Sequence, residues 1–491
     1  MKILLSAVMA LSLWGTLAWG NDTVPAEAAA QAEAMADVVV DEDAFSVEEA
    51  EAVTDTAVDE SSFAVSVFRG FLGIGILLGL VTMLSVDRRA INWRLVAGGI
   101  GLQILLGVSI LKISAVRSIF EYASKFFVAI LEFTGAGAEF LFGRLVTDME
   151  SFGFIFTFQV LPTIVFFSAL TSLLYYLGIL QRIVYGFAWV MSRAMALSGA
   201  ESVAAAANVF VGQTEAPLVI KPYIPKMSRS EIMALMTGGM ATIAGAVLVA
   251  YIGLLAGDDT ALQQVYATHL LVASIMNAPA ALVMAKIMIP ETESVKRQIL
   301  IPKEDVGSNA LDALAGGTTQ GLQLALNVGA MLLVFIAMVA MINALFNLLG
   351  SGTGLNDWVA QATNGRFEVL SMQSIMGFIF APIAWVIGVN AQDILVFGSL
   401  LGEKMIINEF VAYNSLTQAR DAGLFVDPKS VTIATYALCG FANLSSIGIQ
   451  IGGISVLAPE KRALLCTLGV RAMIGGTVAT LLTACIAGVL V

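Results

Sequence analysis

Apolar runs of about 20 residues follow one another from about residue 71 to the end of the chain. An α-helix needs about 20 apolar residues to cross the ~30 Å hydrocarbon core of a bilayer. Because that core holds no water, the backbone there must satisfy its own hydrogen bonds, and such a run is confined to helix. With 58% hydrophobic and 13% charged residues among 491, the sequence predicts an all-α polytopic membrane protein.

The first 62 residues differ from the rest of the chain. Residues 1–20 have a short basic start, an apolar core and small residues at Ala18 and Gly20. This is typical of a cleavable secretory signal peptide, with an uncleaved first helix as the alternative. Residues 21–62 are rich in Ala, Val, Asp and Glu and lack Lys and Arg, which predicts a disordered acidic leader in the periplasm. Residues 1–60 hold one Lys and thirteen acids, so they account for the whole net charge of −12.

Basic residues beside the apolar runs set the expected topology, because cytoplasmic turns carry an excess of Lys and Arg. Residues 114–146 mix six charged side chains with many Phe, Leu and Ile, which favours an amphipathic helix at an interface. Residues 291–320 are predicted to form a cytoplasmic loop, and residues 350–366 a Gly- and Asn-rich loop on the outer side. Eight transmembrane helices are expected, at about residues 71–86, 95–113, 152–180, 232–255, 270–289, 322–349, 431–456 and 464–491.

Two further apolar segments are interrupted by polar residues. The first, residues 182–226, has basic residues on both sides and is therefore predicted to enter and leave the membrane by one face, as a re-entrant hairpin. Its tip is expected near Gly199–Glu201 or in the Asn208–Glu215 region, and two ordinary spans are the alternative. The second segment covers residues 370–420. The order hairpin, broken helix, helix thus occurs twice from opposite faces, and such inverted repeats indicate a secondary transporter with its site between the repeats.

This pattern also predicts the domain organisation. Residues 182–290 and 367–491, each a hairpin followed by a broken helix, are expected to form the transport domain. The remaining segments are the signal peptide at 1–20, the acidic leader at 21–62, the N-terminal scaffold helices and interfacial helix at 63–181, and the cytoplasmic loop with a scaffold helix at 291–366.

The stretch Asn208–Lys226, NVFVGQTEAPLVIKPYIPK, concentrates polar groups between apolar flanks. A carboxylate such as Glu215 costs at least ~2.5 kcal/mol at bilayer depth, so it should face protein or a water-filled cavity. Gly212 and Pro217 both break a helix. A break with polar side chains exposes groups to a solute, whereas the simpler interpretation is a structural kink with a satisfied glutamate.

Four polar clusters are expected to converge in the repeats: Gln213-Thr214-Glu215, Thr242, Asn408-Glu409, and Asn443 with Ser445 and Ser446. Carboxylates accept from sugar hydroxyls, amides both donate and accept, and Phe441 can pack on a ring face. No Lys or Arg lies within these clusters, which disfavours an anionic solute; Lys404, the nearest, is expected to face water. The oxygens of Asn208 and Thr242 suit Na⁺. Taken singly, each polar residue is also explained by an interhelical hydrogen bond.

Three motifs carry a resemblance to a known family. GQTEAPLVIKPY (Gly212–Tyr223), GEKMIINEFVAY (Gly402–Tyr413) and CGFANLSSIGIQIGG (Cys439–Gly453) closely resemble the signature motifs of the concentrative nucleoside transporters. The similarity covers roughly residues 65–491. It implies a homotrimer of eight-helix protomers, each with two re-entrant hairpins and an interfacial helix. The nucleoside-binding residues that it implies are Gln213, Thr214, Glu215, Glu409, Phe441, Asn443 and Ser446, with Val247 acting through water.

The resemblance also implies a sodium site formed by the side chains of Asn208 and Thr242 and the backbone carbonyls of Val211 and Ile243. Thr242 stands where the family's hydroxyl can be Ser, and the oxygen is kept. The motif GQTEAP favours sodium, since proton-driven bacterial members resemble GQSEN at this point. A proton-coupled nucleoside symporter with the same pocket, using Glu215 or Glu409 as the proton carrier, is the alternative.

The sequence therefore predicts sodium-driven nucleoside import across a bacterial inner membrane, with a periplasmic N-terminus, no organic cofactor and no nucleic-acid partner. An intramembrane hydrolase is disfavoured because the chain has a single His and no serine motif near it. The three cysteines have no metal-binding spacing. A passive channel is the third class of function, but two occluding hairpins around one site fit alternating access better than they fit a channel.

Overall fold

The computed structural model describes residues 60–153, 155–257, 259–293 and 307–491. Within these ranges every regular element is a helix, which confirms the predicted all-α class. The described residues all belong to one compact unit, Val58–Val491. The predicted signal peptide and all but the last three residues of the predicted leader lie outside the described residues.

Seven helical stretches of the described residues are long and apolar enough to cross a membrane. The predicted spans are all found among the helices, with 232–255 and 431–456 each divided into two shorter helices. The N-terminal elements are α4 (Glu60–Met83), α5 (Trp93–Lys112), α6 (Ser114–Phe142), α7 (Arg144–Thr147), α8 (Met149–Phe152), α9 (Phe156–Gln159) and α10 (Leu161–Tyr176). The predicted amphipathic segment is thus one long helix, α6, whose place at an interface stays a prediction.

The first predicted hairpin is present and its turn is now located. It comprises α11 (Ile179–Met195), α12 (Gly199–Asn208), α13 (Ala216–Val219) and the 3₁₀ turn η1 (Ile224–Lys226). The turn between α12 and α13 is the Asn208–Glu215 region, and the Gly199–Glu201 end is the start of α12. Arms of 10 and 4 residues are too short to cross a bilayer, so the alternative of two ordinary spans is wrong.

The first broken helix follows this hairpin. It consists of α14 (Arg229–Ala241) and α15 (Gly245–Ala256), separated at Thr242–Ala244, and α16 (Thr260–Met288) comes next. The backbone N–H of Gly245 donates to the carbonyl of Phe210 at 3.0 Å. The hairpin turn therefore lies directly against the break.

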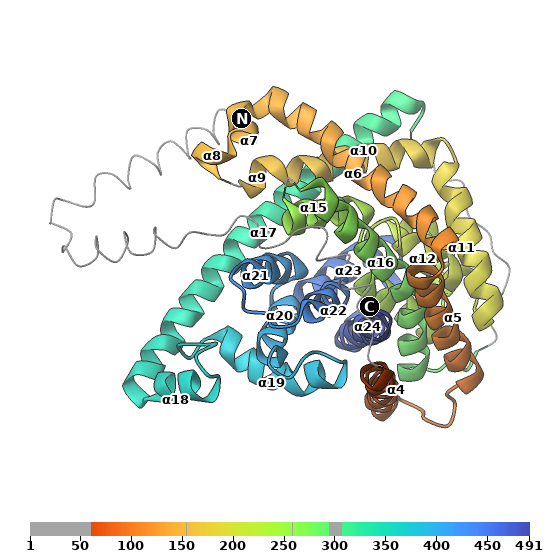
Figure 1. Cartoon of the computed structure of the whole chain (residues 1–491). Coiled ribbons are helices and arrows are strands. Elements are labelled where there is room, and N and C mark those ends of the chain that lie inside the picture. Colours follow the sequence, from red (N-terminus) through yellow and green to blue (C-terminus); the bar gives the residue numbers. More distant parts are fainter. Residues whose placement is uncertain (1–59, 154, 258, 294–306) are drawn as a thin grey trace. The chain divides into compact units, whose positions relative to one another are not determined.

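The second repeat has the same order. Its hairpin elements are α19 (Met372–Val386), α20 (Ile394–Ile406) and α21 (Glu409–Asp421), and its broken helix is α22 (Pro428–Leu438) with α23 (Leu444–Leu457). The turn η2 (Pro459–Lys461) leads into α24 (Arg462–Leu490). Helices α14 and α22, the first halves of the two broken helices, both pack against α24, which in turn packs along α16. Helices α22, α24 and α16 are labelled in Figure 1.

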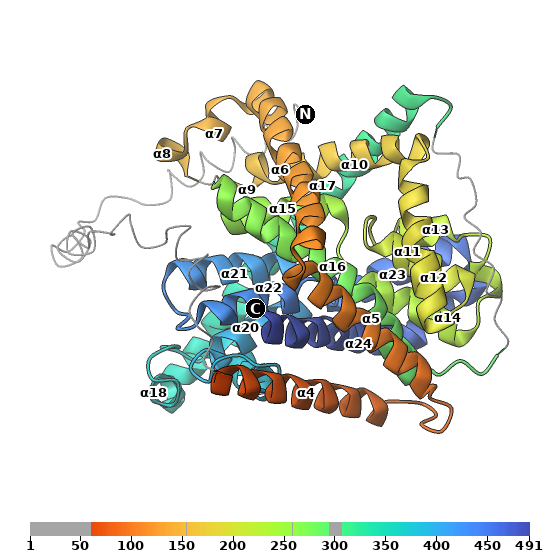
Figure 2. The ribbon, with the colours of Figure 1, turned by 45° about the vertical axis from the view of Figure 1, so that its right-hand side comes forward.

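The predicted loops at 291–320 and 350–366 are wrong over most of their described length. Helix α17 runs from Ala310 to Thr353, and α18 (Leu355–Ala362) follows it after Gly354. Small residues of α17 allow close helix packing: a Cβ on Gly317 would lie 2.7 Å from the Ser168 carbonyl of α10. Tertiary contact here overrides the weak helix propensity of Gly and Thr. Figure 2 shows α17 passing behind α10.

Candidate functional site

The breaks in the two broken helices meet. A Cβ on Gly440 would lie 2.6 Å from the carbonyl oxygen of Ala241, the last residue of α14, so only glycine permits this approach. Gly476 of α24 is similarly close to Met240, with 2.9 Å between its ideal Cβ and the Met240 Cβ. The two repeats thus bring their irregular backbone to one place, as the sequence predicts.

Glu409, the first residue of α21, is buried and accepts a hydrogen bond at each carboxylate oxygen. The hydroxyl of Tyr251 donates to Oε1 at 2.8 Å, and Nδ2 of Asn443 donates to Oε2 at 2.9 Å. Asn443 in turn caps α23, because its Oδ1 accepts from the backbone N–H of Ser446 at 2.8 Å and from the hydroxyl of Ser445 at 2.7 Å. The second hairpin is therefore joined to both broken helices.

Gln213 joins the first hairpin to the second broken helix. Its Nε2 donates to the hydroxyl of Ser446 at 3.1 Å, and its Oε1 accepts from Nε2 of Gln450 at 3.0 Å. Gln450 also donates to the carbonyl of Met236 at 3.0 Å. Gln213, Ser446, Asn443 and Glu409 thus form one connected polar chain.

The remaining predicted nucleoside residues lie on the same elements. Oε2 of Glu215 is buried without a hydrogen-bond partner and lies over Gly212, where a Cβ would be 2.2 Å away. Thr214 is exposed, and its methyl group lies 3.5 Å from the ideal Cβ of Gly453. Val247 is in the first turn of α15, and Phe441 is in the second break; both are buried. An unpartnered buried acceptor costs free energy, so this oxygen of Glu215 is a candidate for a ligand contact.

The predicted sodium residues also come together. Both polar atoms of the Asn208 amide are buried without a partner, and its Nδ2 lies 3.2 Å from the ideal Cβ of Gly238. The hydroxyl of Thr242 donates to the carbonyl of that same Gly238 at 2.9 Å. The backbones of Val211 and Ile243 are in the adjoining turn and break. Neutral amide, hydroxyl and carbonyl oxygens fit a hard monovalent cation.

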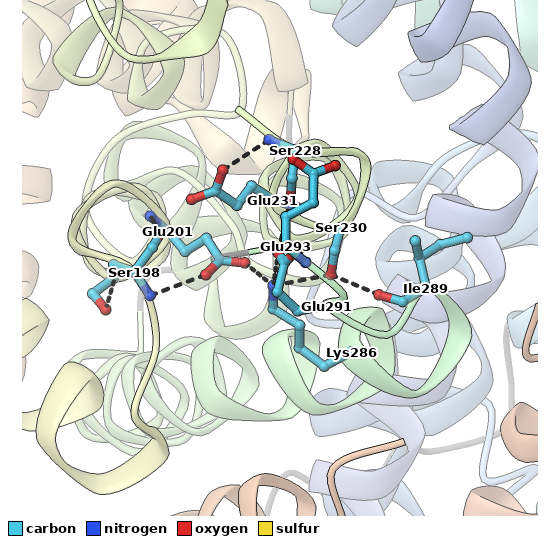
Figure 3. Close-up of polar contacts among 10 residues, drawn as sticks. Ser198, Glu201, Ser228, Ser230, Glu231, Lys286, Ile289, Glu291 and Glu293 are labelled. Carbon is cyan, nitrogen blue, oxygen red and sulfur yellow. Dashed lines mark hydrogen bonds and ion pairs between the residues drawn. The ribbon is translucent and has the colours of Figure 1, made fainter. Parts of the chain in front are cut away.

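A cluster of charges fixes the other end of α12 (Figure 3). Lys286, near the end of α16, forms an ion pair with Glu201 and a second one with Glu291 at 3.2 Å. It also donates to the hydroxyl of Ser230 at 3.0 Å. Glu201 is 1% exposed and accepts from the backbone N–H of Ser198, forming the capping box that starts α12. The arm that carries Asn208 is thereby anchored on α14 and α16.

The prediction that Lys404 faces water is wrong. Its side chain is fully buried, and its Nζ donates to the carbonyl of Ala437 at 2.8 Å and to the hydroxyl of Thr480 at 3.0 Å. The ammonium group lies at the C-terminus of α22, where the helix dipole favours a positive charge. Lys404 thus supports the second break.

Sequence reasoning missed three side chains of the site: Tyr251, Asn277 and Gln450. Tyr251 and Asn277 each stand alone in an apolar helix, with no motif around them, whereas Gln450 lies within the motif Cys439–Gly453 but was not singled out there. Such residues can be found in the sequence only as single polar side chains within an apolar helix. A polar side chain at that depth of the membrane requires a hydrogen-bond partner inside the protein.

Family models match most of the described chain. The model for the N-terminus of Na⁺ dependent nucleoside transporters matches residues 72–145, one described as nucleoside recognition matches 157–257, and the model for the transporters' C-terminus matches 269–488. An uncharacterized transporter of Haemophilus influenzae is 40% identical over 431 residues, covering 87% of this chain and 98% of the relative. The rat sodium/nucleoside cotransporter 1 is 38% identical over 437 residues. This chain belongs to the concentrative nucleoside transporter family.

Solved structures of this family agree with the fold. CNTnw, a concentrative nucleoside transporter in an inward-facing substrate-bound state, gives a TM-score of 0.78 at 39% identity, covering 86% of this chain and 99% of that one. A doubly substituted CNTnw in an outward-facing state gives a TM-score of 0.80 at 38% identity. The chain spans 63% of the rat cotransporter and 58% of the rat solute carrier family 28 member 3. The family is one of transporters, so the expectation of a non-enzyme is confirmed.

Proposed function

We propose that this concentrative nucleoside transporter imports nucleosides into a bacterial cell together with sodium ions. The observation that carries the proposal is the hydrogen-bonded chain from Gln213 through Ser446 and Asn443 to Glu409. It joins the turn of one hairpin to the start of the other hairpin's last helix, and so a solute bound there contacts both repeats.

The chemistry of this chain suits a nucleoside. The Glu409 carboxylate can exchange the hydroxyl of Tyr251 and the amide of Asn443 for the ribose hydroxyls, which are donors of the same kind. The Gln213 amide and the unpartnered Glu215 oxygen offer one donor and two acceptors for the edge of a base. Thr214, Ser446 and Phe441 complete the contacts, with Val247 reached through water.

Sodium is proposed to bind the side chains of Asn208 and Thr242 with the carbonyls of Val211 and Ile243. The support is the unpartnered Asn208 amide beside Thr242 at the end of α14. Such an ion would tie the hairpin turn to the first break. Because Gln213–Glu215 are in the same turn, sodium binding would order the nucleoside-binding groups, which is a direct route to coupling.

Alternating access is proposed to move the two hairpin repeats, residues 182–290 and 367–491, relative to scaffold helices in 63–181 and 291–366. We further propose a homotrimer in the inner membrane, with a signal peptide and a periplasmic N-terminus. The support for assembly is α17, of which most large apolar side chains, such as Leu333 and Leu348, are exposed. Lipid or a second copy of the chain covers such a surface.

Proton coupling is the second candidate, favoured by one observation. The buried Oε2 of Glu215 has no hydrogen-bond partner. Burying a neutral, protonated carboxyl there costs less free energy than burying a charged carboxylate. Protonation of Glu215 would then replace sodium as the event that prepares the turn.

Uptake of radiolabelled uridine into proteoliposomes distinguishes these functions. An inward sodium gradient at equal pH should drive accumulation above the equilibrium level, and a proton gradient in sodium-free buffer should not. Accumulation driven by protons alone would replace sodium with Glu215 as the coupling site. Equilibration without accumulation under either gradient would contradict secondary active transport.

A further inference from the structure

One side chain bridges the two breaks. Asn277 lies in the middle of α16 and is fully buried. Its Nδ2 donates to the carbonyl of Ala241 at 2.9 Å and to the carbonyl of Cys439 at 2.7 Å. Each of the two amide hydrogens therefore makes a hydrogen bond, one with the first repeat and the other with the second.

The two acceptors lie at the C-terminal ends of the first halves of the two broken helices. Ala241 is the last residue of α14, and Cys439 is the C-cap residue that follows Leu438, the last residue of α22. The final carbonyls of a helix lack partners within the helix, and at membrane depth no water replaces them. Asn277 supplies the missing donor to both ends at once.

The orientation of the Asn277 amide is fixed by its surroundings. Its Oδ1 is buried without a partner. Rotating the amide by half a turn would place that oxygen against two carbonyl oxygens, and all three are acceptors only. The donors alone thus determine how the side chain lies.

Each acceptor adjoins one of the two proposed ligand sites. Ala241 precedes Thr242 and Ile243 of the sodium site, and Cys439 lies two residues before Phe441 of the nucleoside site. Because Gly440 lies so close to Ala241, the two breaks have little room to move relative to each other. A displacement of the first break therefore changes the position of the second through Asn277.

We propose that Asn277 is the positioning residue that couples sodium binding to nucleoside binding in this transporter. The inference rests on the proposed function. Sodium on Thr242 and Ile243 fixes the end of α14, and the shared amide then holds the end of α22 where Phe441 and Asn443 meet the nucleoside. Such a coupling is reciprocal, so nucleoside must raise sodium affinity by the same factor.

Uridine binding to the purified full-length protein, titrated over a range of sodium concentrations, tests this role. The measured quantity is the coupling factor, the ratio of the uridine Kd without sodium to the Kd at saturating sodium. Each buried hydrogen bond is worth a factor of about 2–10, so Asn277→Ala should reduce the coupling factor by roughly 5-fold or more. Asn277→Ser keeps one hydroxyl donor and should give an intermediate value.

The matched control is Gln103→Ala. Gln103 is also a fully buried amide between helices, donating to the hydroxyl of Thr483 at 2.7 Å, but it contacts neither break. Its variant should keep the wild-type coupling factor. If Asn277→Ala weakens uridine and sodium binding while the coupling factor stays within about 2-fold of wild type, Asn277 is only structural.

If Asn277→Ala does not purify as folded protein, the same titration is made with Asn277→Ser. A wild-type coupling factor in Asn277→Ser would overturn the proposal. Failure of the proposed function has a separate signature. In that case wild-type protein itself binds uridine equally with and without sodium, before any variant is compared.

Discussion

The ion pair at the start of α12 gives an asymmetric prediction for two substitutions. Lys286 has three partners: Glu201, Glu291 and the hydroxyl of Ser230. Among the residues that the structure describes, Lys286 is the only one that forms an ion pair with Glu201, which is 1% exposed, whereas Glu291 is 18% exposed at its side chain. Removing the lysine therefore isolates a buried carboxylate, but removing the carboxylate leaves the lysine paired.

The two costs follow from this difference. Lys286→Met leaves Glu201 charged and buried, a change that destabilises proteins by about 3–5 kcal/mol. Glu201→Gln keeps an amide oxygen for Lys286 and the Glu291 ion pair, so its cost should not exceed about 1.5–3 kcal/mol, the value of a hydrogen bond to a charged group. The double variant contains no isolated buried charge and should be more stable than Lys286→Met alone.

Equilibrium unfolding in mixed micelles, with dodecyl sulfate as the denaturant and without nucleoside, measures the three free energies of unfolding. The double-mutant cycle then isolates the interaction between the two side chains. A Glu201→Gln variant as unstable as Lys286→Met, or a double variant whose loss equals the sum of the single losses, would refute the reasoning. Either result would mean that Glu201 is not held charged by Lys286.

Three further predictions concern the binding sites and the topology. Asn208→Ala should raise the sodium concentration for half-maximal uptake, at a cost of ~1–3 kcal/mol for the lost ligand, with little effect on nucleoside affinity at saturating sodium; unchanged sodium dependence would place the ion elsewhere. Glu409→Gln should lower nucleoside affinity roughly 10- to 100-fold because a charge-assisted bond becomes neutral. A 2′,3′-dideoxynucleoside should lose much less, and equal losses would contradict a ribose contact. Cysteines at positions 182 and 226, introduced with Cys466→Ser to remove the exposed native thiol, should both react only from the cytoplasmic side.

The breaks were predictable because their signals are local. Gly212 and Pro217 interrupt an apolar segment around Glu215, and the order of elements repeats later in the chain. These features follow from backbone chemistry at membrane depth, where a polar interruption of a helix requires a compensating contact. The wrong loop at 291–320 had no such signal, because the close packing of Gly317 on α10 is a contact between segments far apart in the sequence.

Lys404 shows why side-chain direction was harder to predict. It follows Glu403, which accepts from Nε2 of Gln373 at 2.9 Å, on the side of α20 that meets α19. Successive residues of a helix point about 100° apart, so Lys404 instead faces Ala437 and Thr480. Lys404 was expected to face water, although both it and Glu403 are buried in the protein.

In the second repeat, the two kinds of helix end differ in how far away their partners lie. Two N-terminal ends are capped locally: Asn408 of the hairpin accepts from the backbone N–H of Val411 at 3.0 Å, and Asn443 of the broken helix accepts from that of Ser446 at 2.8 Å. A side-chain acceptor three residues away is part of the motif itself, so both residues were identified from the sequence. In the first broken helix, α15 has no side-chain cap, and the N–H of Gly245 donates instead to the carbonyl of Phe210.

The C-terminal ends need donors that a nearby side chain seldom supplies, since the free groups there are carbonyls. Here the donors come from other helices, Asn277 of α16 and Lys404 of α20, at separations of 36 residues for Asn277–Ala241 and 33 for Lys404–Ala437. Nothing near Ala241 or Cys439 in the sequence points to these partners. A chain that breaks two helices inside a membrane must nevertheless provide them, and Asn277, which donates to both breaks, is the one of these two side chains placed to transmit movement between them.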